Sequence, residues 1–304
     1  MSRLAWIALS AATVALVAGV AAGALILASP AKKTPTNAVT VSGAPRSFEL
    51  PLAESPSALA LAKHWGDLLV GIAARPGGPV EIAALRAETA LPASSLEVRL
   101  DDRRIAAKPC ETGCARIDVL VLEGSRKRLT VRSGTRSLTF ELPARLPPIG
   151  ARVFARALRT MDRLRSFRFS EELSSGREAL LTNVDVEAPD RVRLSSSNGF
   201  RSVIIGKNRW DYHDGRWERG PFPGLKLSQM LMWHGAKHTR IVGRRGRLTE
   251  LAAYGLEPVP AWFGLTVEPS GRVVKAEMIS PSHFMVHRYK DFNGPVSITP
   301  PGRK

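Results

Sequence analysis

The hydrophobic pattern of the chain begins with a long apolar run. Between Arg3 and Lys32 the sequence contains no charged residue, and residues 4–28 are almost entirely apolar. About 20 apolar residues make a helix long enough to cross the hydrocarbon of a bilayer. We therefore expect residues 1–29 to form a transmembrane anchor or uncleaved signal. A cleaved secretory signal and a buried N-terminal helix are the alternatives. Both the anchor and the cleaved signal place the bulk of the chain outside the cytoplasm. The anchor would make the chain a single-pass protein of the cell membrane.

Residues 30–46 are rich in Pro, Thr, Ala and Gly, and this composition predicts a linker. From residue 47 to 146 short apolar or alternating runs are separated by turn residues, a pattern typical of an all-β sandwich of immunoglobulin-like type. The strands are expected at 66–72, 80–82, 96–100, 117–122, 129–131 and 138–142. Pro143, Pro147 and Pro148 then mark a domain boundary.

A helix is predicted to open the second unit, residues 150–304. Apolar residues recur at helical spacing from Val153 to Leu164. Four arginines, Arg152, Arg156, Arg159 and Arg163, fall on another face. We interpret this face as solvated, with contact to a membrane surface as the alternative. Further strands are expected at 167–169, 192–194, 203–205, 209–212, 262–268, 273–279 and 284–292, and a short helix at 225–233. The class is α+β, a long antiparallel sheet with one or two helices on one face.

Charge and cysteine content limit the partners and the chemistry that we expect for the protein. The formal net charge of +17 is compatible with nucleic acid or anionic lipid as a partner. No basic block with interleaved aromatic residues is present, so we expect no nucleic-acid partner. An arginine bias on solvated strand faces explains the charge better. The two cysteines, Cys110 and Cys114, are close in sequence, and in an extracytoplasmic protein they most simply form a disulfide around a turn. A redox pair would favour CxxC spacing, and a thiolate metal site would need further ligands.

The C-terminal half resembles the LolA/LppX-like envelope lipoprotein carriers and lipid-binding lipoproteins. The residues that carry the resemblance are 204–210, 214–217 and 289–301. It implies a curved antiparallel half-barrel whose helix-covered concave side holds acyl chains. The full expected fold is thus an N-terminal transmembrane helix, an immunoglobulin-like sandwich and an α+β half-barrel with covering helices.

The sandwich region resembles the extracytoplasmic module associated with CopD/YtkA-type copper-resistance proteins. Residues 66–70, 76–78, 110–114 and 140–143 carry this resemblance. It implies a role accessory to copper resistance and a membrane copper-transport protein as a partner. This region, however, contains one histidine, His64, and no methionine, so the histidine ligands expected of a CopC-like copper site are not visible in it.

Two sets of candidate site residues follow. The apolar concavity implied by the carrier resemblance would be lined by aromatic residues and one methionine: Trp210, Trp217, Trp233, Trp262, Phe263 and Met285. A softer set could instead bind Cu(I), because thioether and imidazole groups suit that ion: Met230, Met232, His234, His238, His283, Met285 and His287. Ordinary packing of these methionines is the simpler explanation.

No nucleophile elbow, zinc-protease helix, phosphate loop or dinucleotide fingerprint occurs in the sequence. We therefore expect a non-enzymatic envelope protein without a cofactor that binds a lipid, a lipoprotein acyl chain or an envelope partner. Extracytoplasmic Cu(I) binding is the alternative function.

Overall fold

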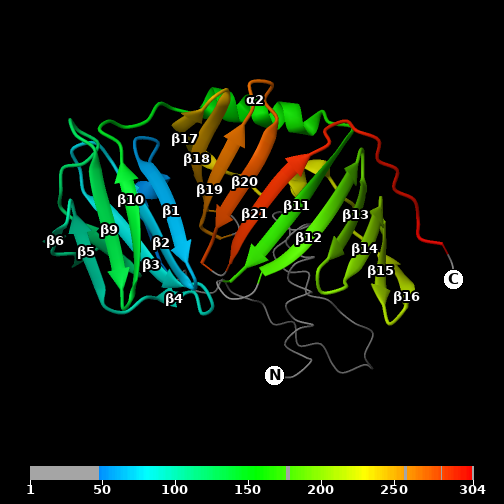
Figure 1. Ribbon diagram of the computed structural model, residues 1–304, viewed down its shortest axis with the longest axis horizontal. Helices are drawn as coiled ribbons and strands as arrows, with labels where there is room; N and C mark the ends of the chain where they lie inside the picture. The colour runs from blue at the N-terminus through cyan, green and yellow to red at the C-terminus, as the bar shows by residue number, and fades with distance from the viewer. Residues whose placement is uncertain (1–47, 176–178, 257–258, 282, 303–304) are drawn as a thin grey trace.

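The computed structural model describes residues 48–302, apart from 176–178, 257–258 and 282. Antiparallel strands in three sheets make up most of this region (Figure 1). Sheets A and B come from the N-terminal part, which begins with the 3-10 helix η1 (Pro51–Glu54). Their strands are β1 (Leu59–Trp65), β2 (Leu68–Ala74), β3 (Val80–Arg86), β4 (Leu91–Pro92), β5 (Leu96–Leu100), β6 (Arg103–Ile105), β7 (Lys108–Pro109), β8 (Cys114–Ile117), β9 (Lys127–Ser133) and β10 (Arg136–Leu142).

Sheets A and B pack face to face. Sheet A has the order β1-β2-β3-β8-β7, with β4 on β3, and sheet B has the order β10-β9-β5-β6. Strand β2 is buried along its whole length. Its even-numbered residues, such as Val70 and Ile72, join the core shared with sheet B. Leu69 and Ala73, on the other face, join a second core. Sheet A is therefore a middle layer, which explains why β2 reads as a continuous apolar run rather than an alternating one.

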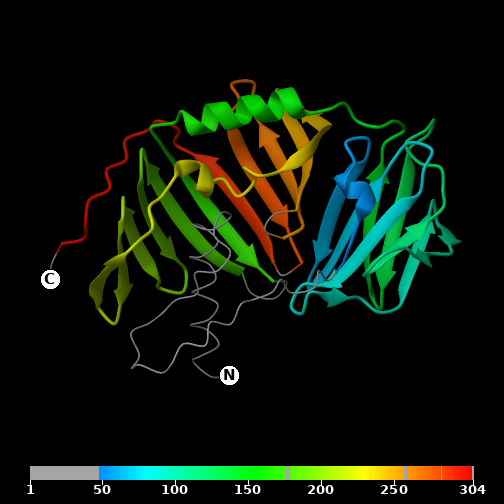
Figure 2. The ribbon, with the colours of Figure 1, turned by 180° about the vertical axis from the view of Figure 1, so that it is seen from behind.

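Sheet C contains the remaining eleven strands, in the order β16-β15-β14-β13-β12-β11-β21-β20-β19-β18-β17. Two antiparallel meanders meet where β11 pairs with β21, and the sheet curves across the molecule (Figures 1 and 2). Its elements, with the helices that accompany it, are α2 (Ala151–Asp162), β11 (Ser166–Ser174), β12 (Ala179–Glu187), β13 (Arg191–Ser196), β14 (Arg201–Ile205), β15 (Asn208–His213), β16 (Arg216–Pro221), η2 (Leu227–Met230), β17 (Lys237–Arg245), β18 (Leu248–Gly255), β19 (Ala261–Val267), β20 (Val273–Ile279) and β21 (Phe284–Lys290).

One face of sheet C, which we call the inner face, is covered by α2 and by the segment 222–236 that contains η2 (Figure 2). The opposite, outer face contacts sheet A. There Tyr254, Trp262 and Phe284 share a core with Leu69 and Phe48. The two parts of the chain thus have a common apolar interface.

Arg240 ties this interface together. Its side chain is only 6% exposed. The guanidinium group donates hydrogen bonds to three carbonyl oxygens, those of Ala58 at 3.2 Å, Pro147 at 3.0 Å and Pro56. Burial lowers the pKa of Arg240. Five donors in a rigid fork suit arginine to such a cluster of acceptors.

Three features of the predicted fold need correction. The transmembrane helix expected over residues 1–29 lies outside the described residues, and none of the described helices has the length and hydrophobicity to span a bilayer. The predicted fold class and the single-pass location in the cell membrane are therefore wrong as stated, and membrane contact through that helix is not supported. The covering helices expected over the sheet are reduced, in the described part of the chain, to one α-helix, α2.

The immunoglobulin-like type is not supported either. An immunoglobulin sheet pairs strands in the order A-B-E-D, whereas β1, β2 and β3 of sheet A are consecutive neighbours in a meander. The strand expected at 117–122 ends at Ile117, and the helix expected at 225–233 is reduced to the single turn η2. Leu120 in the former segment is 68% exposed, so its apolar residues are not held on one buried face.

Candidate functional site

The inner face of sheet C is apolar because alternate residues of its strands point to it. Cross-strand pairing fixes which residues share this face. Phe169 of β11 lies opposite Val184 of β12 and Tyr289 of β21, and Val184 lies opposite Leu194 of β13. The same parity continues across the sheet through Ile204, Met285, Met278, Phe263, Leu265 and Leu251.

The cover of this face is also apolar. Helix α2 turns Phe154, Ala157 and Met161 inward, the positions that its helical periodicity predicts. Trp233, from the segment after η2, is completely buried. Its ring meets that of Phe154 edge-on, with 5.6 Å between centroids. Aromatic rings and methionines therefore lie between the helix and the sheet.

A row of polar side chains crosses the middle of this apolar face. His287 of β21 lies opposite Glu171 of β11, Glu171 opposite Thr182 of β12, and Thr182 opposite Ser196 of β13. His287 Nε2 is 2.8 Å from Glu171 Oε2, and the hydroxyls of Thr182 and Ser196 are 2.8 Å apart. Glu171 is 1% and His287 2% exposed, so this end of the row is enclosed, whereas Ser196 at the other end is half-buried.

Tyr289 completes the arrangement. Its hydroxyl is 3.1 Å from Nδ1 of His287. When Nε2–H of a neutral imidazole donates to the Glu171 carboxylate, Nδ1 keeps its lone pair and accepts the Tyr289 proton. Burial raises the pKa of Tyr289. The phenol therefore stays protonated at physiological pH and can serve as this donor.

Two fully buried polar atoms of this face, Glu171 Oε1 and Ser202 Oγ, have no hydrogen-bond partner. The indole N–H of Trp233 is instead directed at the Tyr289 hydroxyl and opposes the rise in the Tyr289 pKa. Ser202 lies opposite Leu194, on the inner face. A buried polar group without a partner costs about 1–3 kcal/mol, and such groups in folded proteins call for an explanation such as a water or a ligand. The inner face thus offers an acceptor and a hydroxyl within apolar surroundings.

The predicted ligand set is divided between the two faces. Trp233, Phe263 and Met285 belong to the inner core. Trp262 is one residue from Phe263 and so points to the outer face, where it packs against sheet A.

Trp210 lies opposite Val203, and Trp217 opposite Tyr212. This parity also places both tryptophans on the outer face. There Arg219 lies over the Trp210 ring, and Trp217 packs edge-on against Tyr212.

The predicted metal set is dispersed. Met230 and Met232 are buried in the inner core, whereas His234 is exposed and His238 half-buried at the start of β17. Met285 and His287 do share the inner face, but both ring nitrogens of His287 already have protein partners. Burial lowers the pKa of His283, which precedes β21. Within the described part of the chain no three His, Cys, Asp or Glu side chains are grouped to hold a metal. Copper binding stays a prediction.

Sequence reasoning missed Glu171, Tyr289 and Ser202. Tyr289 continues the alternation of Met285 and His287, and this was a usable signal. Glu171 is far from His287 in sequence, and only strand pairing brings the two together. Cys110 and Cys114 form a disulfide with 5.3 Å between their Cα atoms. It closes the turn between β7 and β8, away from the inner face.

No protein-family model matches the chain, and no curated protein matches it. Among solved structures, the chain is similar to the lipoprotein LppX of Mycobacterium tuberculosis, with 15% identity, a TM-score of 0.39 and coverage of 49% of this chain and 97% of that one. It is also similar to LprF of Mycobacterium bovis, with 12% identity, a TM-score of 0.39 and coverage of 51% and 99%. A LolA superfamily protein of Nitrosomonas europaea is a third, with 10% identity, a TM-score of 0.27 and coverage of 49% and 95%.

LppX and the LolA superfamily are also the two names in the resemblance noted for the C-terminal half. The resemblance of residues 47–146 to a copper-resistance module stays a prediction. The function proposed below rests on the residues of this chain.

Proposed function

We propose that the inner face of sheet C binds a hydrophobic ligand, a lipid or lipoprotein acyl chain, through a non-catalytic mechanism. The observation that carries the proposal is the pair of unpartnered polar atoms, Glu171 Oε1 and Ser202 Oγ, on an otherwise apolar face. An acyl chain with a polar end matches both properties. The apolar part contacts the sheet, and the polar end meets the unpartnered atoms.

The extent of the sheet supports the same conclusion. Eleven strands spaced by about 4.8 Å span about 48 Å, whereas the 12-residue helix α2 is about 18 Å long. The helix alone therefore spans less than half of the inner face, and the irregular segment 222–236 supplies much of the remaining cover. Met230, Met232, Met278 and Met285 contribute to its core, and flexible methionine side chains readily repack around an apolar ligand.

The polar row also restricts the ligand's head. The free oxygen Oε1 of Glu171 can accept a hydrogen bond. A hydroxyl of a neutral glycerol ester can donate to it, whereas the ionised head of a free fatty acid has no proton to donate. We therefore expect tighter binding of monoolein than of oleate, two ligands that share the oleoyl chain.

Native mass spectrometry of the purified chain, followed by titration with these two ligands, tests the proposal. Ile204 and Val203 are adjacent buried residues on opposite faces of β14, 1% and 4% exposed, and they provide a matched pair. Ile204→Trp on the inner face should weaken monoolein binding at least tenfold, and Val203→Trp on the outer face should not. Circular dichroism verifies that each variant is folded. No co-purified lipid together with no uptake of either ligand would refute the proposal.

Ser202→Ala gives a second test that does not depend on bulk. Removing an unpartnered buried hydroxyl should leave the ligand-free melting temperature unchanged or slightly raised. It should weaken monoolein binding roughly two- to tenfold, the effect of one hydrogen bond of ~0.5–1.5 kcal/mol. Unchanged affinity in Ser202→Ala would remove this hydroxyl from the site.

A further inference from the structure

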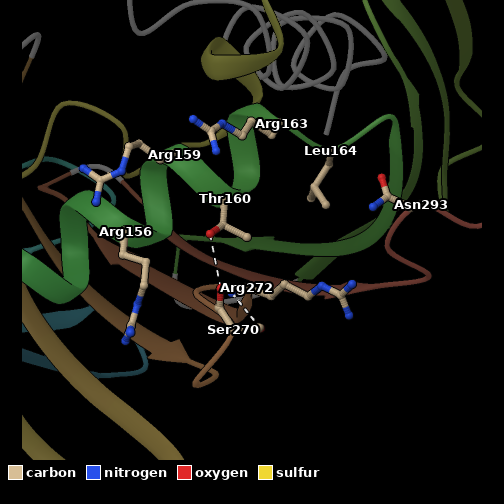
Figure 3. A pocket seen from close by; sticks show the side chains of 8 residues that line it. All are labelled: Arg156, Arg159, Thr160, Arg163, Leu164, Ser270, Arg272 and Asn293. Atoms are coloured by element: carbon tan, nitrogen blue, oxygen red, sulfur yellow. Dashed lines mark hydrogen bonds between the residues drawn. The ribbon is translucent and has the colours of Figure 1, made fainter.

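A pocket lies at the surface, where the C-terminal half of α2 meets the turn between β19 and β20 (Figure 3). Its volume is about 420 Å³, and four of the side chains that line it are arginines: Arg156, Arg159, Arg163 and Arg272. Arg156 and Arg159 lie on α2 and Arg163 directly follows its last residue, at the spacing i, i+3 and i+7, so the three share one side of the helix. The fourth, Arg272, directly precedes β20.

The walls of this pocket are held in place by specific contacts. Thr160 Oγ1 on the helix donates a hydrogen bond to the carbonyl of Ser270 in the turn, at 3.3 Å. Gly271 has a φ of +93°, and a Cβ there would lie 2.5 Å from Thr160 Oγ1, so the turn can approach the helix this closely only with glycine. On the third side, Asn293 Oδ1 accepts a hydrogen bond from the backbone N–H of Arg165 at 2.8 Å.

The charge of the pocket is unbalanced. Its lining contains no carboxylate. In the ranges that the structure describes, none of the four guanidinium groups forms an ion pair, although Arg272 lies over the Phe292 ring at 5.3 Å. Of the nearby acids, Glu268 accepts a hydrogen bond from the Ser270 hydroxyl and Asp291 pairs with Arg168.

We propose that this pocket binds a phosphate-bearing anion, either the headgroup of a phospholipid or a soluble phosphate ester. Guanidinium groups donate paired hydrogen bonds to phosphate oxygens and stay charged at all physiological pH values. Because its acceptor is already used, Asn293 keeps its NH₂ group to donate to the same anion. Leu164 is the one lining residue of the pocket that also belongs to the inner core, and neither Glu171 nor Ser202 lines the pocket, so this proposal stands independently of the acyl-chain site.

The test uses the full chain with three probes: inorganic phosphate, glycerol 1-phosphate, and vesicles of phosphatidylcholine with or without phosphatidylglycerol. Calorimetry measures the soluble anions, and cosedimentation measures the vesicles. The variant Arg159→Gln/Arg163→Gln removes two pocket charges. A matched control, Arg103→Gln/Arg152→Gln, removes two exposed charges outside the pocket and leaves the same net charge.

We expect the pocket variant to weaken binding at least tenfold and the control to change it less than twofold. Binding of glycerol 1-phosphate identifies a soluble ester as sufficient, whereas binding only to phosphatidylglycerol vesicles identifies the lipid headgroup as the source. Equal weakening in both variants would show that the overall positive charge attracts anions without a site, and would overturn the proposal. Absence of binding to every probe would also overturn it.

Discussion

Replacing Arg240 with alanine should destabilise the interface between sheets A and C. The loss in the free energy of unfolding should exceed that caused by substituting a surface residue. The side chain extends from β17 of sheet C and donates to carbonyl groups that precede β1 and α2. The substitution leaves these three acceptors without their donor at a buried interface. The substitution also leaves unfilled the volume of the arginine side chain, which is only 6% exposed.

The magnitude follows from two opposing contributions. Each buried acceptor that loses its partner costs about 1–3 kcal/mol, and water entering the vacated space recovers part of this. Removing a desolvated cation is favourable, and the lowered pKa of Arg240 is a sign of that desolvation. Because the groups left behind are neutral carbonyls rather than an unpaired charge, we expect Arg240→Ala to lower the free energy of unfolding by about 3 kcal/mol.

Urea denaturation followed by tryptophan fluorescence measures this loss. Arg244 lies on the same strand and is exposed, so Arg244→Ala is the matched control and should change the free energy of unfolding by less than about 0.5 kcal/mol. Arg240→Lys keeps the charge but loses the planar fork, and its free energy should be intermediate. If Arg240→Ala were as stable as Arg244→Ala, the carbonyl cluster would not stabilise the interface and the reasoning would fail.

Two further predictions concern the same interface and sheet A. A Cβ at Gly71 would overlap the Trp262 ring, so Gly71→Ala should lower the free energy of unfolding by at least about 1–3 kcal/mol, and an unchanged denaturation midpoint would contradict this contact. Burial raises the pKa of Glu81, despite the hydrogen bond that its carboxylate accepts from the backbone N–H of Leu52. Glu81 therefore binds a proton more tightly in the folded protein than in the unfolded one. Stability is consequently lost as pH rises through the folded pKa. Glu81→Gln keeps the acceptor and removes that loss; its melting temperature should exceed that of the wild type near neutral pH but not near pH 4, and equal differences at both values would refute the titration argument.

Much of sheet C could be predicted from local pattern. The helical stripe from Val153 to Leu164 corresponds to α2, and the turn at Asp214 and Gly215 joins β15 to β16. These features depend on residues close in sequence, where periodicity and turn chemistry act directly. Strands β12, β17 and β18, by contrast, were not predicted. The sequence of β17 is rich in basic residues because it is an edge strand, and charged edges are common in sheets.

The candidate site was less predictable because it depends on strand order. The pairing of β21 with β11 brings His287 to Glu171 across 116 positions of sequence, and no local pattern encodes that pairing. The division of the tryptophans has the same origin. Their aromatic character put Trp262 and Phe263 in the same predicted ligand set. The two residues lie on opposite faces of β19, one toward sheet A and the other toward α2, and the sequence does not show which layer each face meets.

The two faces of β19 therefore have separate roles. Phe263 and Leu265 contribute to the inner core, while Trp262 between the strand and sheet A contributes to the interface. Because a strand alternates with period two, the sheet can hold a rigid partner on one face and keep the other for an exchangeable ligand. Sheet A supports the curved sheet from outside without using any residue of the inner face. An interface variant such as Arg240→Ala should accordingly lower stability while a folded sample keeps its monoolein affinity, whereas Ser202→Ala should have the opposite profile.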